Sequence, residues 1–187
     1  MIDRTEAAAY LVSRLTDELV VASLGNDKYD LMAAGDRNRN FYMWNAMGLA
    51  SSMGLGLAMA RPETRVIVSE GDGSLLMNLG ALATIAVRSP ENLVYVSWDN
   101  RQYAMTGGQE TATAFRTDLA KVAEGAGIAH VERVETLAAF QKAFDRALTE
   151  PGPWFIHVPC ITGEPKGKLP PPTTIKQRFM EALGVSH

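Results

Sequence analysis

The sequence of 187 residues has little of three features that would each point to a class of protein. It contains one cysteine, Cys160, which cannot form an intrachain disulfide, and without a motif around it we expect a packed strand residue rather than a nucleophile. Its formal net charge of -3 gives no basic patch and argues against nucleic acid as a partner. No uncharged apolar run reaches the roughly 18 residues of a membrane span, and the N-terminus lacks a secretion-signal pattern. We therefore expect a cytoplasmic globular protein.

Apolar runs of strand length alternate with segments of helical periodicity along most of the chain. The runs do not alternate in polarity, which is typical of buried parallel strands. We expect an α/β fold, a single doubly wound parallel sheet with helices on both faces, formed by residues 1–160. Residues 161–187, with Gly163, Pro165, Gly167 and several further prolines, predict an extended C-terminal arm that ends in a short helix.

The bounds of the elements follow from periodicity and from turn residues. Small residues crowd Gly48–Ala60, and a segment of about 13 residues is too short for a membrane, so it predicts a helix lying close against the sheet. Strands are expected at 19–24, 41–44, 65–70, 93–98, 130–134 and 154–158. Helices are expected at 2–16, 28–34, 48–60, 75–87, 118–126, 137–149 and 175–183.

Two strands of this sheet each deliver a polar group where they end. Gly71, Asp72, Gly73 and Ser74 follow one apolar run directly, and Asn100 follows the next run along the chain. The carboxyl ends of parallel strands are where ligands bind in such sheets. Glycines let the backbone approach an anion, free N–H groups at a helix start suit phosphate, and carboxylate and amide oxygens suit Mg²⁺. The spacing predicts a clamp for magnesium and a diphosphate.

These residues resemble the thiamine diphosphate motif, Gly-Asp-Gly followed some two dozen residues later by Asn-Asn, of thiamine diphosphate-dependent decarboxylases and their relatives. The first Asn of that pair is Asp99 here. The resemblance implies Mg²⁺ ligation by the side chains of Asp72 and Asn100 and by the carbonyl of Gln102, where the family commonly has Gly. Gln102 fits that place if its φ is negative. The diphosphate would be held around Gly71 by the N–H groups of Gly73 and Ser74, with Tyr103 nearby.

Asn45-Ala46-Met47-Gly48 resembles the other cofactor segment of the family. The resemblance implies that Met47 is an apolar residue that wedges beneath the cofactor and forces its two rings into a bent shape. Methionine also commonly fills ordinary gaps in a core. Asn45 occupies the place of a family Gly whose carbonyl accepts from the cofactor's amino group. Met47 and Asn45 are thus the implied catalytic residues of this chain.

Within the family the chain looks most like the β subunits of sulfopyruvate decarboxylases, and phosphonopyruvate decarboxylases are similar too. The resemblance implies decarboxylation of an anionic three-carbon 2-oxo acid, with the cofactor as electron sink. The activating Glu of the family lies on a pyrimidine-binding domain for which 187 residues leave no room. We therefore expect a separate α subunit to supply it and to share the active site.

Recognition of the substrate anion calls for cationic or hydroxyl donors at the sheet edge. Arg101, Thr106 and Gln109 lie closest in sequence to the metal ligands and are the first candidates, ahead of Arg37 and Arg39. His130 and His157 are expected to be structural and away from the ligand edge. Two alternatives stay open: half of a 2-oxo acid oxidoreductase or carboligase, and a non-catalytic cofactor-binding subunit, which the departures at Asn45 and Gln102 motivate.

Overall fold

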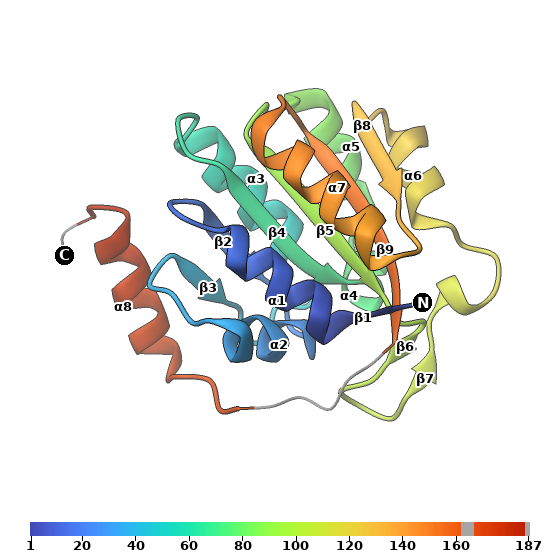
Figure 1. Cartoon of the computed structure of the whole chain (residues 1–187), viewed down its shortest axis with the longest axis horizontal. Coiled ribbons are helices and arrows are strands. Elements are labelled where there is room, and N and C mark those ends of the chain that lie inside the picture. The colour runs from blue at the N-terminus through green and yellow to red at the C-terminus, as the bar shows by residue number, and fades with distance from the viewer. Residues whose placement is uncertain (162–166, 186–187) are drawn as a thin grey trace.

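A parallel β-sheet runs through the middle of the molecule, between two layers of helices (Figure 1). The structure is a computed structural model and describes residues 1–161 and 167–185. Its strands are β1 (Ile2–Asp3), β2 (Leu19–Ala22), β3 (Asn40–Tyr42), β4 (Val66–Gly71), β5 (Leu93–Asp99), β6 (Gln102–Tyr103), β7 (Gln109–Glu110), β8 (His130–Arg133) and β9 (Trp154–Ile161). Its helices are α1 (Arg4–Arg14), α2 (Asp27–Ala34), α3 (Ala50–Ala60), α4 (Asp72–Leu76), α5 (Gly80–Arg88), α6 (Leu119–Ala126), α7 (Leu137–Thr149) and α8 (Pro172–Ala182), with a 3₁₀ turn, η1 (Ala112–Ala114).

The sheet has the order β1-β9-β5-β4-β2-β3, and β8 also pairs with β9. All of these pairs are parallel. The carboxyl ends of the strands therefore meet at one edge, toward the lower right of Figure 1, where α4 and the small β6–β7 hairpin lie. The expected doubly wound parallel fold is confirmed.

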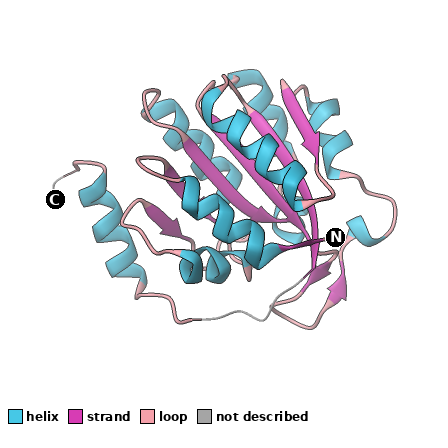
Figure 2. Ribbon diagram, in the orientation of Figure 1, coloured by secondary structure: helices cyan, strands magenta, loops and turns pink. Residues whose placement is uncertain are grey.

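Two hydrophobic cores explain why helices cover both faces of the sheet (Figure 2). One core joins α1, α2 and α7 to the sheet, with Leu11 and Phe144 fully buried. The other joins α3, α5 and α6, with Leu82 and Ala123 fully buried. Among the described residues no helix is long and apolar enough to span a membrane.

The helix α3 lies as close to the sheet as its small residues predict. A Cβ on Gly54 would come within 2.1 Å of a methyl group of Val68 in β4, whereas a Cβ on Gly56 would meet nothing within 4 Å. Only one side of α3 therefore needs glycine for its packing.

Three expected bounds were wrong for tertiary reasons. Residues 2–3 are a short strand that pairs with the end of β9, so the first helix begins at Arg4, capped by Asp3. The expected helix at 75–87 is two helices, α4 and α5, separated by residues 77–79. Strand β9 does not stop at Val158, because Pro159 lies between the part that pairs with β8 and the part that pairs with β1, where a missing N–H is tolerated.

The C-terminal helix α8 covers the edge strand β3. The rings of Phe41 and Phe179 are 5.3 Å apart, and Arg178 makes two hydrogen bonds of 2.6 and 2.7 Å to Asp36. The part of the predicted arm that includes Gly163 and Pro165, and the terminal His187, lie outside the described residues.

Candidate functional site at the carboxyl edge of the sheet

A cavity of about 110 Å³ opens where β2, β4 and β5 end. Its walls come from residues 24–27, 71–74 and 102–106, together with Arg4, Met47, Trp98 and Asn100. The structure thus brings the Gly-Asp-Gly-Ser segment, Asn100, Gln102, Tyr103, Thr106 and Met47 to one place. It does not bring Asn45, Arg101 or Gln109 to the cavity wall.

Asp72 is the first residue of α4 and is almost fully buried. Its Oδ2 accepts hydrogen bonds from the hydroxyls of Thr111, at 2.5 Å, and Thr113, at 3.1 Å. Burial raises the pKa of the Asp72 carboxyl to about 6; the Asp99 carboxylate adds to the rise, and the two hydroxyls oppose it. Because burial disfavours the ionised form of this carboxylate, a bound cation would stabilise its negative charge.

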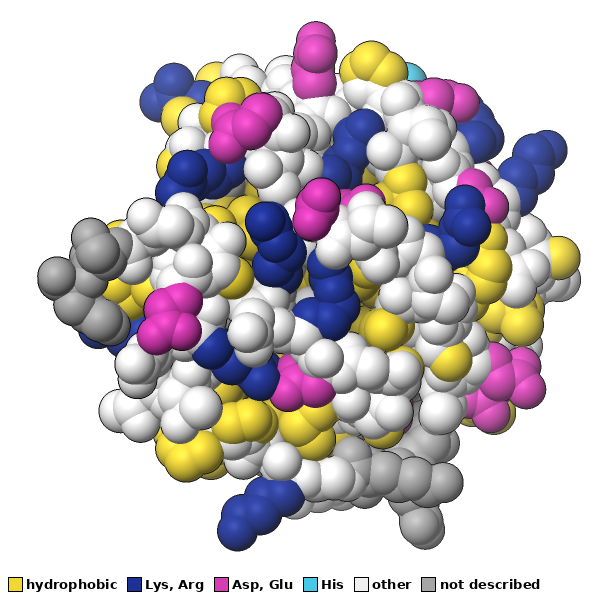
Figure 3. Space-filling view, turned by 60° about the vertical axis from the view of Figure 1, so that its left-hand side comes forward, with side chains coloured by type: hydrophobic (Ala, Val, Ile, Leu, Met, Phe, Trp, Pro, Cys, Tyr) yellow, Lys and Arg dark blue, Asp and Glu magenta, His cyan; other side chains and the backbone are white. Residues whose placement is uncertain are grey.

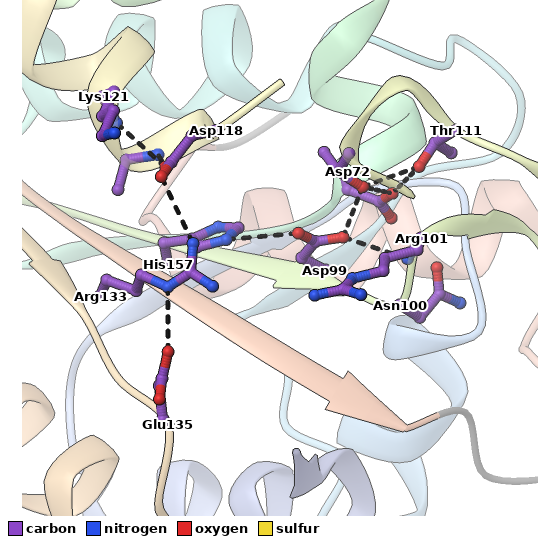
Figure 4. A network of polar contacts seen from close by, with 12 residues as sticks. Asp72, Asp99, Asn100, Arg101, Thr111, Asp118, Lys121, Arg133, Glu135 and His157 are labelled. Carbon is purple, nitrogen blue, oxygen red and sulfur yellow. Dashed lines mark hydrogen bonds and ion pairs between the residues drawn. The ribbon is translucent and has the colours of Figure 1, made fainter. Parts of the chain in front are cut away.

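Asp99 joins the network around Asp72 and connects it to His157 (Figure 4). Its Oδ1 accepts from Thr113 at 2.7 Å, and its Oδ2 lies 3.3 Å from His157 Nε2. Burial by itself raises the pKa of Asp99, but the hydrogen bonds from His157 and Thr113 outweigh it and hold the pKa below its usual value. Asp99, at the place where the resemblance has Asn, thus orients Thr113, one of the two hydroxyl partners of Asp72.

His157 was expected to lie away from the ligand edge, and that expectation was wrong. It sits in β9 opposite Ser97 of β5, and its ring reaches the side chain of Asp99, which directly precedes Asn100. Its contact is with another protein side chain, so its role in the structure is to hold Asp99.

Asn100 begins a tight turn that leads into β6. Its Oδ1 accepts from the N–H of Gln102 at 3.0 Å, and the N–H of Arg101 donates to Asp99 Oδ1 at 3.1 Å. Arg101, not Gln102, adopts the left-handed conformation, with φ 61°. Gln102 was expected to fit its place if its φ is negative. Its backbone is extended in β6, so it meets that condition.

Gly73 and Tyr103 lie in direct contact, which explains one of the two motif glycines. A Cβ on Gly73 would fall 2.6 Å from the Tyr103 ring. Gly71 is different: its backbone is extended, with φ -74°, and a Cβ there would come no closer than 4.0 Å to any atom of the described chain. The close approach that requires glycine is therefore at Gly73.

The donor set fits Mg²⁺ carried by a diphosphate rather than a metal held by protein alone. Among the described residues there is no group of three or more His, Cys, Asp or Glu that could hold a metal. Both threonine hydroxyls donate to Asp72 Oδ2 and neither donates to its Oδ1, and the backbone N–H of Gly73 acts on the same carboxylate. Mg²⁺ commonly binds one or two protein carboxylates and completes its shell with phosphate oxygens and water.

The segment before α3 has an unusual backbone. Asn45 and Ala46 have φ of 57° and 58°, and Gly48 has φ 86°. Asn is the non-glycine residue that tolerates this region best, so it can replace a family Gly without a change of backbone. Met47, next to these residues, reaches the cavity wall, whereas Asn45 is exposed beside it.

The loop after β2 also lines the cavity, and the sequence had indicated only a turn there. Asp27 accepts from Ser69 at 3.1 Å, and burial raises the pKa of Asp27 to about 7, against the opposing effect of the Arg4 guanidinium. Arg4 is itself buried and pairs with Asp30 at 2.6 Å. One signal could have pointed to this loop: β2 is a third parallel strand, and its carboxyl end lies at the same edge as that of β4.

The proposed anion-binding residues lie at two opposite edges of the sheet. Thr106 lines the cavity and donates to the Tyr103 carbonyl and to Gln109 Oε1, both at 3.2 Å. Arg37 and Arg39 precede β3 and donate to the carbonyls of Thr16 and Asp17, at the opposite edge of the sheet. Figure 3 shows Lys and Arg interspersed with Asp and Glu on the face that it presents, with no large patch of one sign.

Comparison with known proteins bears on the same residues. Residues 29–158 match the family model described as "Thiamine pyrophosphate enzyme, C-terminal TPP binding domain". The chain is 46% identical over 163 residues to sulfopyruvate decarboxylase subunit beta of Methanothermobacter thermautotrophicus, covering 87% of this chain and 84% of that one. It is 42% identical to a sulfopyruvate decarboxylase of Methanosarcina acetivorans, covering 97% of this chain and 47% of that one.

A phosphonopyruvate decarboxylase of Streptomyces hygroscopicus is also similar, with 39% identity over 87% of this chain and 41% of the relative. Among solved structures, a putative thiamin diphosphate-dependent enzyme from Mycobacterium smegmatis superposes with a TM-score of 0.73 at 19% identity, covering 87% of this chain and 32% of that one. The structural likeness shows that the fold is shared.

Proposed function

The chain belongs to the thiamine pyrophosphate enzyme family, as the half that carries the C-terminal TPP binding domain, and on that basis we propose that it is the β subunit of a sulfopyruvate decarboxylase. The observation that carries the proposal is the convergence of Asp72, Asn100, Gln102 and Met47 on one cavity. The reaction would convert sulfopyruvate to sulfoacetaldehyde and CO₂.

We propose for these residues the roles that the family resemblance implies. Asp72 Oδ1, the Asn100 side-chain oxygen and the Gln102 carbonyl would hold Mg²⁺. The N–H groups of Gly73 and Ser74, beside Gly71 and Tyr103, would hold the diphosphate. The hydroxyls of Thr111 and Thr113 fix the orientation of the Asp72 carboxylate and leave one oxygen to the metal.

Met47 and Asn45 would contact the organic part of thiamine diphosphate. Met47 supplies an apolar surface under the rings, and the carbonyl of Asn45 accepts from the amino group. The cofactor supplies the electron sink that takes up the electron pair when the carboxylate leaves. Of the three expected anion-binding residues Arg101, Thr106 and Gln109, only Thr106 lines the cavity, so Thr106 is our candidate for holding the sulfonate.

A partner subunit would complete the site. No glutamate is among the residues that line the cavity in the described chain, so the activating Glu would have to come from elsewhere. The relative from Methanosarcina is about twice as long as the part that matches this chain, which leaves room there for a second domain. Five large apolar side chains in segments at the carboxyl edge are 48–70% exposed: Trp44, Leu49, Met77, Met105 and Phe115. This apolar rim suits an α subunit carrying the pyrimidine-binding domain.

A phosphonopyruvate decarboxylase is the second candidate, because 39% identity to such an enzyme is close to the 46% seen with the sulfopyruvate enzyme. The non-catalytic alternative loses its motivation, since the backbone accommodates both departures from family glycine. The conformation of Asn45 suits Asn, and Gln102 is extended.

The test is CO₂ release by this chain mixed with its α subunit, thiamine diphosphate and Mg²⁺. We expect turnover of sulfopyruvate only when both subunits are present. Faster turnover of phosphonopyruvate would select the second candidate. Robust turnover by this chain alone would refute the shared active site.

A further inference from the structure

A buried carboxylate outside the proposed ligand set joins the two cofactor segments. Glu70, in β4, is completely buried and lies one residue before the Gly-Asp-Gly motif. Its Oε1 accepts a hydrogen bond of 2.5 Å from the Ser74 hydroxyl, and its Oε2 accepts from the Tyr95 hydroxyl of β5. The N–H groups of Ala50 and Ser51, which begin α3, act on the same carboxylate. Three chain segments thus converge on the side chain of Glu70.

Ser74 carries this connection to the segment of Met47. Its hydroxyl donates to Glu70 and accepts from the N–H of Gly48 at 2.9 Å, so both functions of the hydroxyl are used. The carbonyl of Gly48 accepts from Asn78 Nδ2, also at 2.9 Å. The residue directly after Met47 is therefore fixed on both sides by the segment that follows the diphosphate motif.

Steric contact reinforces the hydrogen bonds. A Cβ on Gly48 would lie 3.1 Å from Met77 Cβ and 3.3 Å from the Ser74 carbonyl, and φ at Gly48 is 86°. The interruption between α4 and α5 places Asn78 where its side chain meets Gly48. A continuous helix over 75–87 would have no such interruption.

We propose that Glu70 is a positioning residue: through Ser74 it ties the Met47 segment to the Gly71–Ser74 loop, so that one rigid unit grips both the rings and the diphosphate of the cofactor. This inference rests on the proposed function, because it assigns the two segments to two parts of thiamine diphosphate. Glu70 touches neither part itself. The carboxylate can make this connection because each of its two oxygens accepts from a different hydroxyl, Oε1 from Ser74 and Oε2 from Tyr95.

The test compares two ligands on the complex of this chain with its α subunit. Inorganic pyrophosphate with Mg²⁺ engages the diphosphate loop alone, whereas thiamine diphosphate with Mg²⁺ also engages Met47. Binding is measured by calorimetry for the wild type, Glu70→Gln, Ser74→Ala and Tyr95→Phe. Tyr95→Phe is the matched control, since it removes a buried hydroxyl from the same carboxylate and leaves the link to Gly48 intact.

We expect Glu70→Gln and Ser74→Ala to weaken thiamine diphosphate binding at least about tenfold, or 1.4 kcal/mol, and to change pyrophosphate binding less than about twofold. Tyr95→Phe should leave both affinities within about twofold. In a Met47→Ala background, Ser74→Ala should cause no further loss, because the contact that it positions is gone.

An equal loss of both ligands would show that Glu70 serves the diphosphate loop only, and no loss of either would show that it serves only the core; each result overturns the proposal. Ser74→Ala keeps the test decisive if Glu70→Gln does not fold. A wild-type complex that binds neither ligand would instead overturn the proposed function.

Discussion

At the scale of single residues, the site depends on how hydrogen bonds orient the carboxylate of Asp72. Thr111 and Thr113 take one oxygen of Asp72, and Asp99 with His157 keeps Thr113 in place. The replacement of a family Asn by Asp99 is therefore part of the support for Asp72. Asn45, in turn, replaces a glycine at a backbone conformation that Asn tolerates.

Asp72→Asn tests the metal clamp. The amide keeps an oxygen for the two threonine hydroxyls but loses the charge that Mg²⁺ prefers, so we expect Mg²⁺-dependent cofactor affinity to fall by more than about tenfold. The thermal midpoint of the ligand-free protein should not fall, because the change removes a buried charge near Asp99. Asp145→Asn, at a partly exposed carboxylate bound to Tyr10 and Arg14, is the control that should leave affinity intact. Unchanged affinity in Asp72→Asn would exclude the clamp.

Asp27→Asn tests the buried acid of the β2 loop. Burial raises the pKa of Asp27 from 3.8 to about 7, so the folded protein retains a proton that the unfolded chain has lost between these values. The stability that Asp27 contributes is thus complete below about pH 4 and is lost as pH rises through about 7, by at most ~4 kcal/mol. In urea unfolding at pH 5 and pH 8, the fall in stability should be smaller for Asp27→Asn than for the wild type. Equal falls would contradict the assignment.

At the scale of elements, α3 shows how one helix can need glycine on one side only. Gly54 faces Val68 and Gly56 faces open space, so the two positions give opposite expectations for the same change. The distances of 2.1 Å and of more than 4 Å decide the sign in each case.

Gly54→Ala should destabilise the protein, because the new methyl group overlaps a buried valine and outweighs the gain in helix propensity. Gly56→Ala should stabilise it by roughly 0.5–1 kcal/mol, since propensity acts there without a clash. Chemical denaturation of the two single variants measures both effects. A stabilising Gly54→Ala would show that α3 lies farther from β4 than the structure places it.

At the scale of the whole molecule, the carboxyl edge carries both the cavity and an exposed apolar rim. Met77 and Phe115 are 63% and 70% exposed at this edge, while Val87 is 82% exposed near the other end of α5. An exposed apolar rim around a cavity is typical of a surface that another protein covers.

Phe115→Lys and Met77→Lys should weaken association with the α subunit at least about tenfold, because each places a charge in a surface that becomes dry on binding. Val87→Lys should have little effect. Analytical ultracentrifugation of the mixed subunits measures the association, and thermal midpoints confirm that the variants fold. Full association of both rim variants would move the interface elsewhere on the molecule.

The sequence by itself determined the layered architecture and the edge at which the residues of the proposed ligand set lie. Uninterrupted apolar runs require buried parallel strands, and such strands place Asp72 and Asn100 at one edge whatever the details of packing. Periodicity was also sufficient for the helix expected at 118–126, which the structure has as α6, begun by Asp118 as a cap that satisfies free N–H groups.

Only the tertiary structure decided the contacts between segments distant in sequence. The break between α4 and α5, the continuation of β9 through Pro159 and the approach of His157 to Asp99 each depend on a neighbour that no local pattern names. The same holds for Glu70, which the sequence presents as the end of a strand. Its part in the site arises because folding brings the start of α3, Ser74 and Tyr95 around one carboxylate.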